Sequence, residues 1–158
     1  MAGTYSKLGQ DKGSLKYTKK YENRLNERSY LFYSGRTRIG YTYWKNGYKK
    51  EAEKWFNEQK RISEESLKLG RYYSMDAYCD LANIYGLTGE KGKAFENLGK
   101  FAKNHVFPSY RVSWIKEDPM LNSIRNEPEF RKIAIDIETK YQAEHERVRK
   151  WLEEQGKL

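Results

Sequence analysis

The residues that most often carry chemistry are few and scattered in this chain of 158 residues. The two histidines, His105 and His145, lie far apart, and neither belongs to a metal-ligand pattern such as HExxH. The single cysteine, Cys79, lies between Asp76 and Asp80, whose negative charges disfavour a reactive thiolate. We therefore predict no metal, no cofactor and no enzymatic activity.

The composition predicts a folded, positively charged protein. Hydrophobic residues make up 37% and charged residues 34% of the chain, and aromatic residues at 15% supply large side chains for a core. The net charge of +9 permits attraction to nucleic acid, anionic lipid or acidic proteins without choosing among them. No apolar run approaches the roughly 20 residues of a membrane helix. With one cysteine and no signal-peptide stretch, we expect a cytoplasmic location.

The elements that would position any binding residues follow a pattern that occurs three times. In each copy a tyrosine precedes a glycine by four positions. An apolar residue and a small residue come earlier, and a second small residue comes five positions after the glycine. The copies are Met1, Ala2, Tyr5, Gly9 and Ser14; Ile39, Gly40, Tyr43, Gly47 and Ala52; and Leu81, Ala82, Tyr85, Gly89 and Ala94. Such internal repetition predicts an array of helical hairpins, whose function lies on the exposed surface of the stack.

Helical periodicity gives the expected elements. We expect helices at about 30–46, 49–69, 74–87 and 91–104, with the pattern glycines in the turns and Gly70 at a helix end. Gly40 and Ala52 allow close helix approach, and Phe56 fills the space beyond them. The first copy starts at Met1 and is incomplete, so we expect a C-terminal fragment of a longer protein. Gly13 and Ser14 predict an irregular second helix in that copy.

Beyond His105 the repeat pattern stops. We expect a connector at 106–116, a short helix at 119–125 with Leu121 and Ile124 inward, and a long helix at 128–155. The long helix carries an apolar stripe with helical spacing, and we expect it to close the last hairpin. The stripe consists of Phe130, Ile133, Ile137, Tyr141, Val148, Trp151 and Leu152.

The repeated pattern resembles the tetratricopeptide repeat over roughly residues 1–105. This resemblance implies an all-α superhelix of three helical hairpins, at about 1–28 (partial), 30–70 and 72–105, followed at 106–158 by a connector and two C-terminal capping helices. The segment from Asp118 to Phe130 resembles the end of certain bacterial tetratricopeptide proteins. It implies a scaffold region in a larger bacterial regulatory protein.

In tetratricopeptide stacks the first helix of each hairpin lines the concave face, which the resemblance makes the expected protein- or peptide-binding surface. Helical spacing places Thr37, Tyr41, Trp44 and Lys45 there in the second hairpin, and Asp76, Asp80 and Asn83 in the third. Aromatic residues would give apolar contact, Thr37 and Asn83 hydrogen bonds, Lys45 attraction for acidic groups, and the aspartates attraction for basic groups. Alternatively, Tyr41 and Trp44 pack against a neighbouring repeat.

Two other interactions are open from the sequence. Lysines at helical spacing could bind nucleic acid phosphates next to aromatic residues, although a solvated helix surface explains them equally well. The two groups are Lys12, Lys16, Lys19 and Lys20, and Lys45, Lys49, Lys50 and Lys54 near Tyr48 and Trp55. The incomplete first hairpin could also form a homodimer through residues 1–30.

Overall fold

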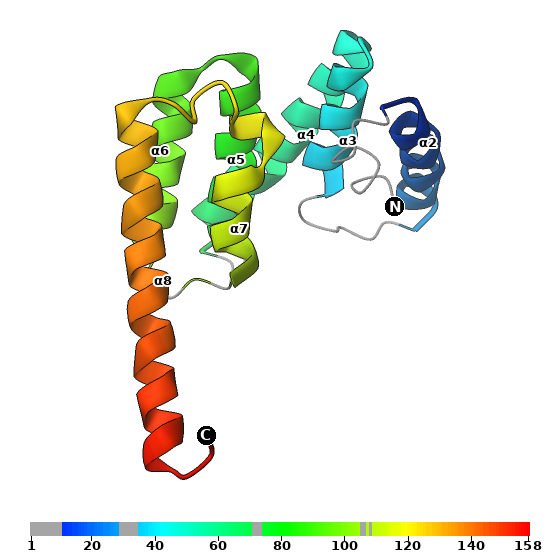
Figure 1. The fold of residues 1–158 in the computed structure, drawn as a ribbon. Coiled ribbons are helices and arrows are strands. Elements are labelled where there is room, and N and C mark those ends of the chain that lie inside the picture. Colours follow the sequence, from blue (N-terminus) through cyan, green and yellow to red (C-terminus); the bar gives the residue numbers. More distant parts are fainter. Residues whose placement is uncertain (1–10, 29–34, 71–73, 105–106, 108) are drawn as a thin grey trace. The chain divides into compact units, whose positions relative to one another are not determined.

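The computed structural model describes residues 11–28, 35–70, 74–104, 107 and 109–158. Within these ranges the chain forms seven α-helices, one short 3-10 helix and no strand, which confirms the predicted all-α fold (Figure 1). The elements are α2 (Asp11–Arg28), α3 (Gly35–Lys45), α4 (Lys49–Lys68), α5 (Ser74–Thr88), α6 (Lys91–Ala102), α7 (Ser109–Glu117), η1 (Pro119–Leu121) and α8 (Pro128–Glu154). The first helix expected near Met1 lies outside the described residues.

The chain divides into two compact units, Met1–Ile84 and Tyr85–Leu158. The boundary falls inside α5, and therefore inside the third predicted hairpin. The first unit holds α2, α3, α4 and most of α5. The second holds the end of α5 together with α6, α7, η1 and α8. The repeat limits expected at 1–28, 30–70 and 72–105 remain predictions.

The α3–α4 hairpin of the first unit depends on the absence of a side chain at Gly40. A Cβ atom built there would lie 2.5 Å from Cε1 of Phe56, far inside the normal carbon–carbon separation. Ala52 is fully buried and Phe56 is 2% exposed, so small residues and one ring fill the helix contact as expected. Gly47 has φ +83° in the turn, and Gly70 has φ +60° after α4, conformations that glycine adopts without strain.

Helix α2 is continuous from Asp11 to Arg28, whereas the sequence predicted an irregular helix. Ser14 explains the difference, because it is 1% exposed and its hydroxyl lies 3.3 Å from that of Thr42 on α3. A small polar residue thus serves as a close helix contact, and tertiary packing outweighs its low helix propensity. Tyr43 also donates a 2.6 Å hydrogen bond to Glu22, which fixes α2 to α3.

The second unit packs α8 against α6 and α7. The predicted connector at 106–116 was wrong in its second half, because Ser109–Glu117 forms α7. Its apolar residues explain the helix: Val112 and Ile115, three positions apart, are both buried, and Trp114 packs edge-on against Phe101 at 5.6 Å. Periodicity over nine residues around a proline is too short to predict a helix reliably.

The short helix expected at 119–125 is limited to the 3-10 turn η1, followed by further turns. Asp118 caps it by accepting a hydrogen bond from the Met120 N–H at 2.9 Å, and Leu121 and Ile124 are fully buried as expected. The long helix agrees with the prediction to within one residue. Its stripe is buried only at Phe130 and Ile137, whereas Trp151 is 50% exposed.

Candidate partner-binding surface on the first unit

A buried carboxylate links α3 and α5, the two helices expected to line the concave face, to α4. Asp80 on α5 is 3% exposed. It accepts hydrogen bonds from the Thr37 hydroxyl on α3 at 2.8 Å and from the Gln59 amide on α4 at 3.2 Å. Burying a carboxylate is costly unless hydrogen bonds compensate for the lost water. Asp80 therefore serves the internal contacts of the unit and does not attract basic groups from solvent.

The predicted binding residues separate into a buried group and an accessible group. The buried group was expected on an open face, and the structure corrects that expectation for Thr37, Tyr41, Asp80 and Asn83, which are 1%, 5%, 3% and 2% exposed. The accessible group consists of Lys45, which is exposed, and Trp44 and Asp76, which are half-buried. Two of the buried side chains meet each other inside the first unit, where the Thr37 hydroxyl donates to Asp80. Only the accessible group can meet a partner without rearrangement.

Trp44, at the C-terminal end of α3, is held from two sides. Its ring lies 6.1 Å from the ring of Phe56, centroid to centroid, and the Lys49 ammonium lies 3.3 Å from the Trp44 ring centroid. The same ammonium donates to the Trp44 carbonyl at 3.3 Å. An ammonium over an indole face is attracted by the negative face of the ring. This arrangement fixes an aromatic edge and a positive charge next to each other in solvent.

Tyr48, just after the turn glycine, extends this accessible end. It is 44% exposed, packs edge-on against Tyr43 at 6.1 Å, and has the Lys19 ammonium 5.9 Å from its ring centroid. We define the turn surface as Trp44, Lys45, Tyr48, Lys49 and Lys50. From the sequence, Tyr48 was considered only as an aromatic residue near the second lysine group. The residue that indicates its exposed position is Gly47, which precedes it. A large residue directly after a turn glycine starts the next helix from an exposed position.

The environment of Tyr43 keeps its phenol protonated. Burial, together with the hydrogen bond to Glu22 and its negative charge, raises the pKa of Tyr43 well above its ordinary value. The phenol therefore donates to Glu22 over the whole neutral range. Because Glu22 lies on α2, this bond holds α2 beside the turn surface.

Both predicted lysine groups are solvent-facing where they are described. Lys16, Lys19 and Lys20 are exposed on α2, and the side chain of Lys12 lies outside the described residues. Lys45, Lys49, Lys50 and Lys54 are all exposed around the α3–α4 turn. The contact between Lys19 and Tyr48 brings the two groups together at the turn surface. Glu51 lies in the first turn of α4, next to Lys50, so the turn carries a carboxylate beside its lysines.

Of the residues considered for catalysis, the structure describes Cys79 and His145, whereas His105 lies outside the described residues. Cys79 is 1% exposed, and His145 on α8 lies beside the Tyr141 ring at 6.1 Å. Among the described residues, no group of three or more histidine, cysteine or acidic side chains could hold a metal ion. In the same part of the chain, none of the helices has the length and apolar character needed to cross a membrane.

The family comparison agrees with the hairpin geometry. The model of the tetratricopeptide repeat family matches residues 33–66, which contain α3, the Gly47 turn and most of α4. Residues 33–66 are thus a tetratricopeptide repeat. The repeat supplies a protein–protein interaction module of the general kind that this family uses, and such repeats are usually non-catalytic. No curated protein and no solved structure matches the chain.

Within the tetratricopeptide repeat, the matched segment contains Gly40, Phe56 and all five residues of the turn surface. Gly40 and Phe56 make the close helix contact, and Trp44 rests on that same Phe56 ring. The packing that defines the repeat therefore also positions its most accessible aromatic residue.

Proposed function

We propose that the protein is a non-catalytic interaction scaffold whose turn surface binds an acidic segment of a partner protein. The observation that carries this proposal is the placement of Trp44 between the Phe56 ring and the Lys49 ammonium, beside exposed Lys45. The indole is ordered before any partner arrives, so binding it costs little conformational entropy. The neighbouring ammonium groups favour carboxylates on the bound segment.

The opposite end of the predicted concave face contributes less. The Asp80 carboxylate accepts hydrogen bonds from Thr37 and Gln59, and Asp76 is half-buried. A mixed-charge peptide that needs basic groups at this end finds no free carboxylate at Asp80. We therefore propose a partner segment that is acidic and not one of mixed charge. The resemblance of the C-terminal segment further supports a scaffold role within a cytoplasmic bacterial regulatory protein.

Fluorescence anisotropy with defined probes tests this function. The probe is a labelled peptide of four Glu-Glu-Phe units, compared with a Lys-Lys-Phe peptide of equal length. We expect the acidic peptide alone to bind. Reversing two charges with Lys45→Glu and Lys50→Glu should weaken binding about tenfold, since each exposed ion pair contributes about 0.2–1 kcal/mol and reversal adds repulsion. Lys68→Glu with Lys103→Glu makes the same charge change at other exposed positions and should leave affinity unchanged.

Nucleic acid is an outcome of the same test. Mixed-sequence DNA and RNA are titrated at about 50 mM and about 200 mM salt, where phosphate binding through several lysines would lose orders of magnitude in affinity. Tight, salt-sensitive binding of either, with no binding of the acidic peptide, would replace the proposed function. Equal affinity for the acidic and basic peptides would also contradict it.

A further inference from the structure

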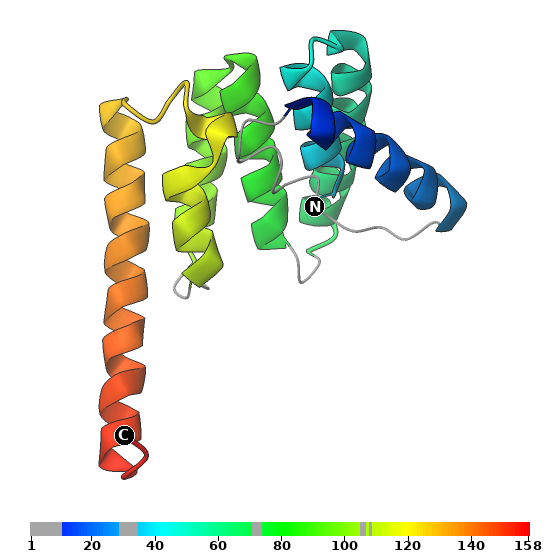
Figure 2. The same cartoon turned by 45° about the vertical axis from the view of Figure 1, so that its right-hand side comes forward.

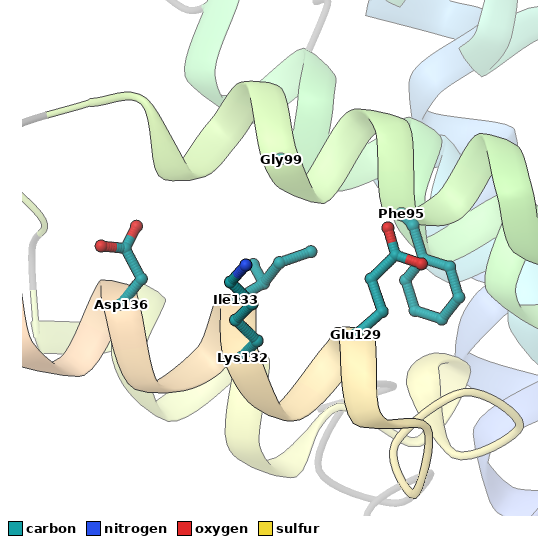
Figure 3. A pocket seen from close by; sticks show the side chains of 6 residues that line it. All are labelled: Phe95, Gly99, Glu129, Lys132, Ile133 and Asp136. Carbon is teal, nitrogen blue, oxygen red and sulfur yellow. The ribbon is translucent and has the colours of Figure 1, made fainter.

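The second unit has an open groove between α6 and α8. It has a volume of about 380 Å³ and is lined by Phe95 and Gly99 from α6 and by Glu129, Lys132, Ile133 and Asp136 from α8. Figure 3 shows the four α8 side chains along one side of the groove, opposite Phe95 and Gly99. A Cβ atom at Gly99 would meet no other atom within 4 Å. The groove therefore has an apolar floor, a charged edge and room for a large side chain.

Helix α8 is much longer than the helices it packs against. At 27 residues it measures about 40 Å, whereas the 12 residues of α6 measure about 18 Å. Figures 1 and 2 show its C-terminal half continuing past the ends of α6 and α7. Ion pairs within the helix, such as Glu144–Arg147 at 2.7 Å and Glu146–Arg149 at 2.8 Å, stabilise this half from within. It is a rigid helix that carries the half-exposed Trp151.

The groove-lining side of α8 continues along the projecting half. Steps of three and four residues follow one face of a helix. From Glu129 they lead through Ile133, Asp136, Lys140, Ala143, Glu144, Arg147 and Trp151 to Glu154, and Lys132 lies at the edge of the same face. We call these ten residues the groove-side face of α8. It carries three cations and four carboxylates, so its net charge is −1 on a chain with net charge +9.

When two copies of this face lie antiparallel, residues of opposite charge face each other. If two copies of α8 lie antiparallel with Ile133 of one facing Trp151 of the other, the two-fold axis passes near Ala143. Asp136 then faces Arg147 of the second copy, and Lys140 faces Glu144 of the second copy. Lys132 likewise lies near Glu154 of the second copy. A parallel pairing in register would instead place each charge opposite itself, which is unfavourable.

We propose that the groove between α6 and α8 is a homodimer interface that receives Trp151 from α8 of a second copy. Each Trp151 enters the groove lined by Phe95, Gly99 and Ile133, and the contact occurs twice because the interface is isologous. Indole burial supplies the apolar contact, and the three charge pairs fix the register. Ala143 at the axis lets the two helices approach closely. This interface belongs to the second unit and does not depend on the turn surface.

Sedimentation velocity of the full chain from about 1 to about 200 µM tests the proposal. We expect a dimer whose dissociation constant rises at least about 30-fold in Trp151→Ala, the ratio that corresponds to a hot-spot residue. Gly99→Leu places a side chain in the groove from a position whose Cβ meets no atom within 4 Å, so it should give a monomer whose melting temperature is unchanged or higher. Ile135→Ala removes an apolar side chain that is 66% exposed and lies away from the groove-side face. It should leave the dimer intact.

A charge exchange distinguishes this pairing from any other self-association. Asp136→Arg alone and Arg147→Asp alone should each give a monomer, because each places like charges opposite one another. The double variant restores the facing pairs with reversed sign and should recover the dimer. Circular dichroism of each variant establishes that α8 stays helical. A wild-type chain that is monomeric at about 200 µM would overturn the proposal. So would a dimer that survives both Gly99→Leu and Trp151→Ala, since it would use another surface, such as residues 1–30.

Discussion

Replacing Gly40 with alanine should destabilise the protein although alanine is the better helix former. The new methyl group would lie 2.5 Å from Cε1 and 2.6 Å from Cδ1 of Phe56, a ring that is 2% exposed and cannot turn into solvent. Overpacking of this kind costs about 1–3 kcal/mol, and the gain in helix propensity is about 1 kcal/mol. We therefore expect Gly40→Ala to lower the free energy of unfolding by up to about 2 kcal/mol.

Gly99→Ala provides the matched control, because its Cβ meets no atom within 4 Å in the interior of α6. It should gain up to about 1 kcal/mol from helix propensity alone. The assay is urea denaturation followed by circular dichroism, with the m-value compared among variants. Phe56→Leu in the Gly40→Ala background should recover part of the loss, because the smaller side chain relieves the contact. A Gly40→Ala protein at least as stable as wild type would refute the close approach of α3 and α4.

Three further perturbations test particular contacts. Asp80→Ala removes the buried acceptor of the Thr37 hydroxyl and leaves the Gln59 amide with Ser63 alone, so urea denaturation should show a loss of about 1–3 kcal/mol; a loss below about 0.5 kcal/mol would mean that Asp80 is a surface residue. The Tyr43 phenol keeps its proton in the folded chain at pH values above 10.0, where the unfolded chain loses it. The hydrogen bond from Tyr43 to Glu22 therefore stabilises the folded state fully below pH 10.0, and this contribution is lost as the pH rises above it. The urea midpoint should therefore fall from about pH 9 to about pH 11 in wild type and fall less in Tyr43→Phe. Arg125 donates to the carbonyls of Ile115 at 3.0 Å and Asp118 at 2.6 Å, so Arg125→Ala should cost about 1.5–3 kcal/mol by thermal denaturation, whereas exposed Arg131→Ala should have almost no effect.

The hairpin architecture could be predicted because its determinants are local in sequence. Gly40, Gly47 and Ala52 lie within one repeat, and each acts through backbone conformation or close packing that a single residue type dictates. The same reasoning missed α7, whose nine residues offer few positions for a periodic pattern. It also overextended the buried stripe of α8, because spacing cannot show where the helices packed against it end.

The candidate site was harder to predict than the fold. Helical spacing placed both Thr37 and Asp80 on the concave face. Their hydrogen bond joins residues 43 positions apart, and no local sequence pattern encodes such a pairing. Periodicity also gave no indication that Tyr48 would stand exposed and pack against Tyr43. Polar residues on the first helices of a stack can face solvent or each other, and only the packing of neighbouring helices decides between these arrangements.

In the proposed function a partner binds the protein at the accessible end of the α3–α4 hairpin. Lysine acetylation read by mass spectrometry tests it directly, with the Glu-Glu-Phe peptide present or absent. We predict that the peptide lowers labelling at Lys45, Lys49 and Lys50 and leaves labelling at Lys68 and Lys103 unchanged. Unchanged labelling at the three turn lysines under saturating peptide, or protection confined to other helices, would contradict the account.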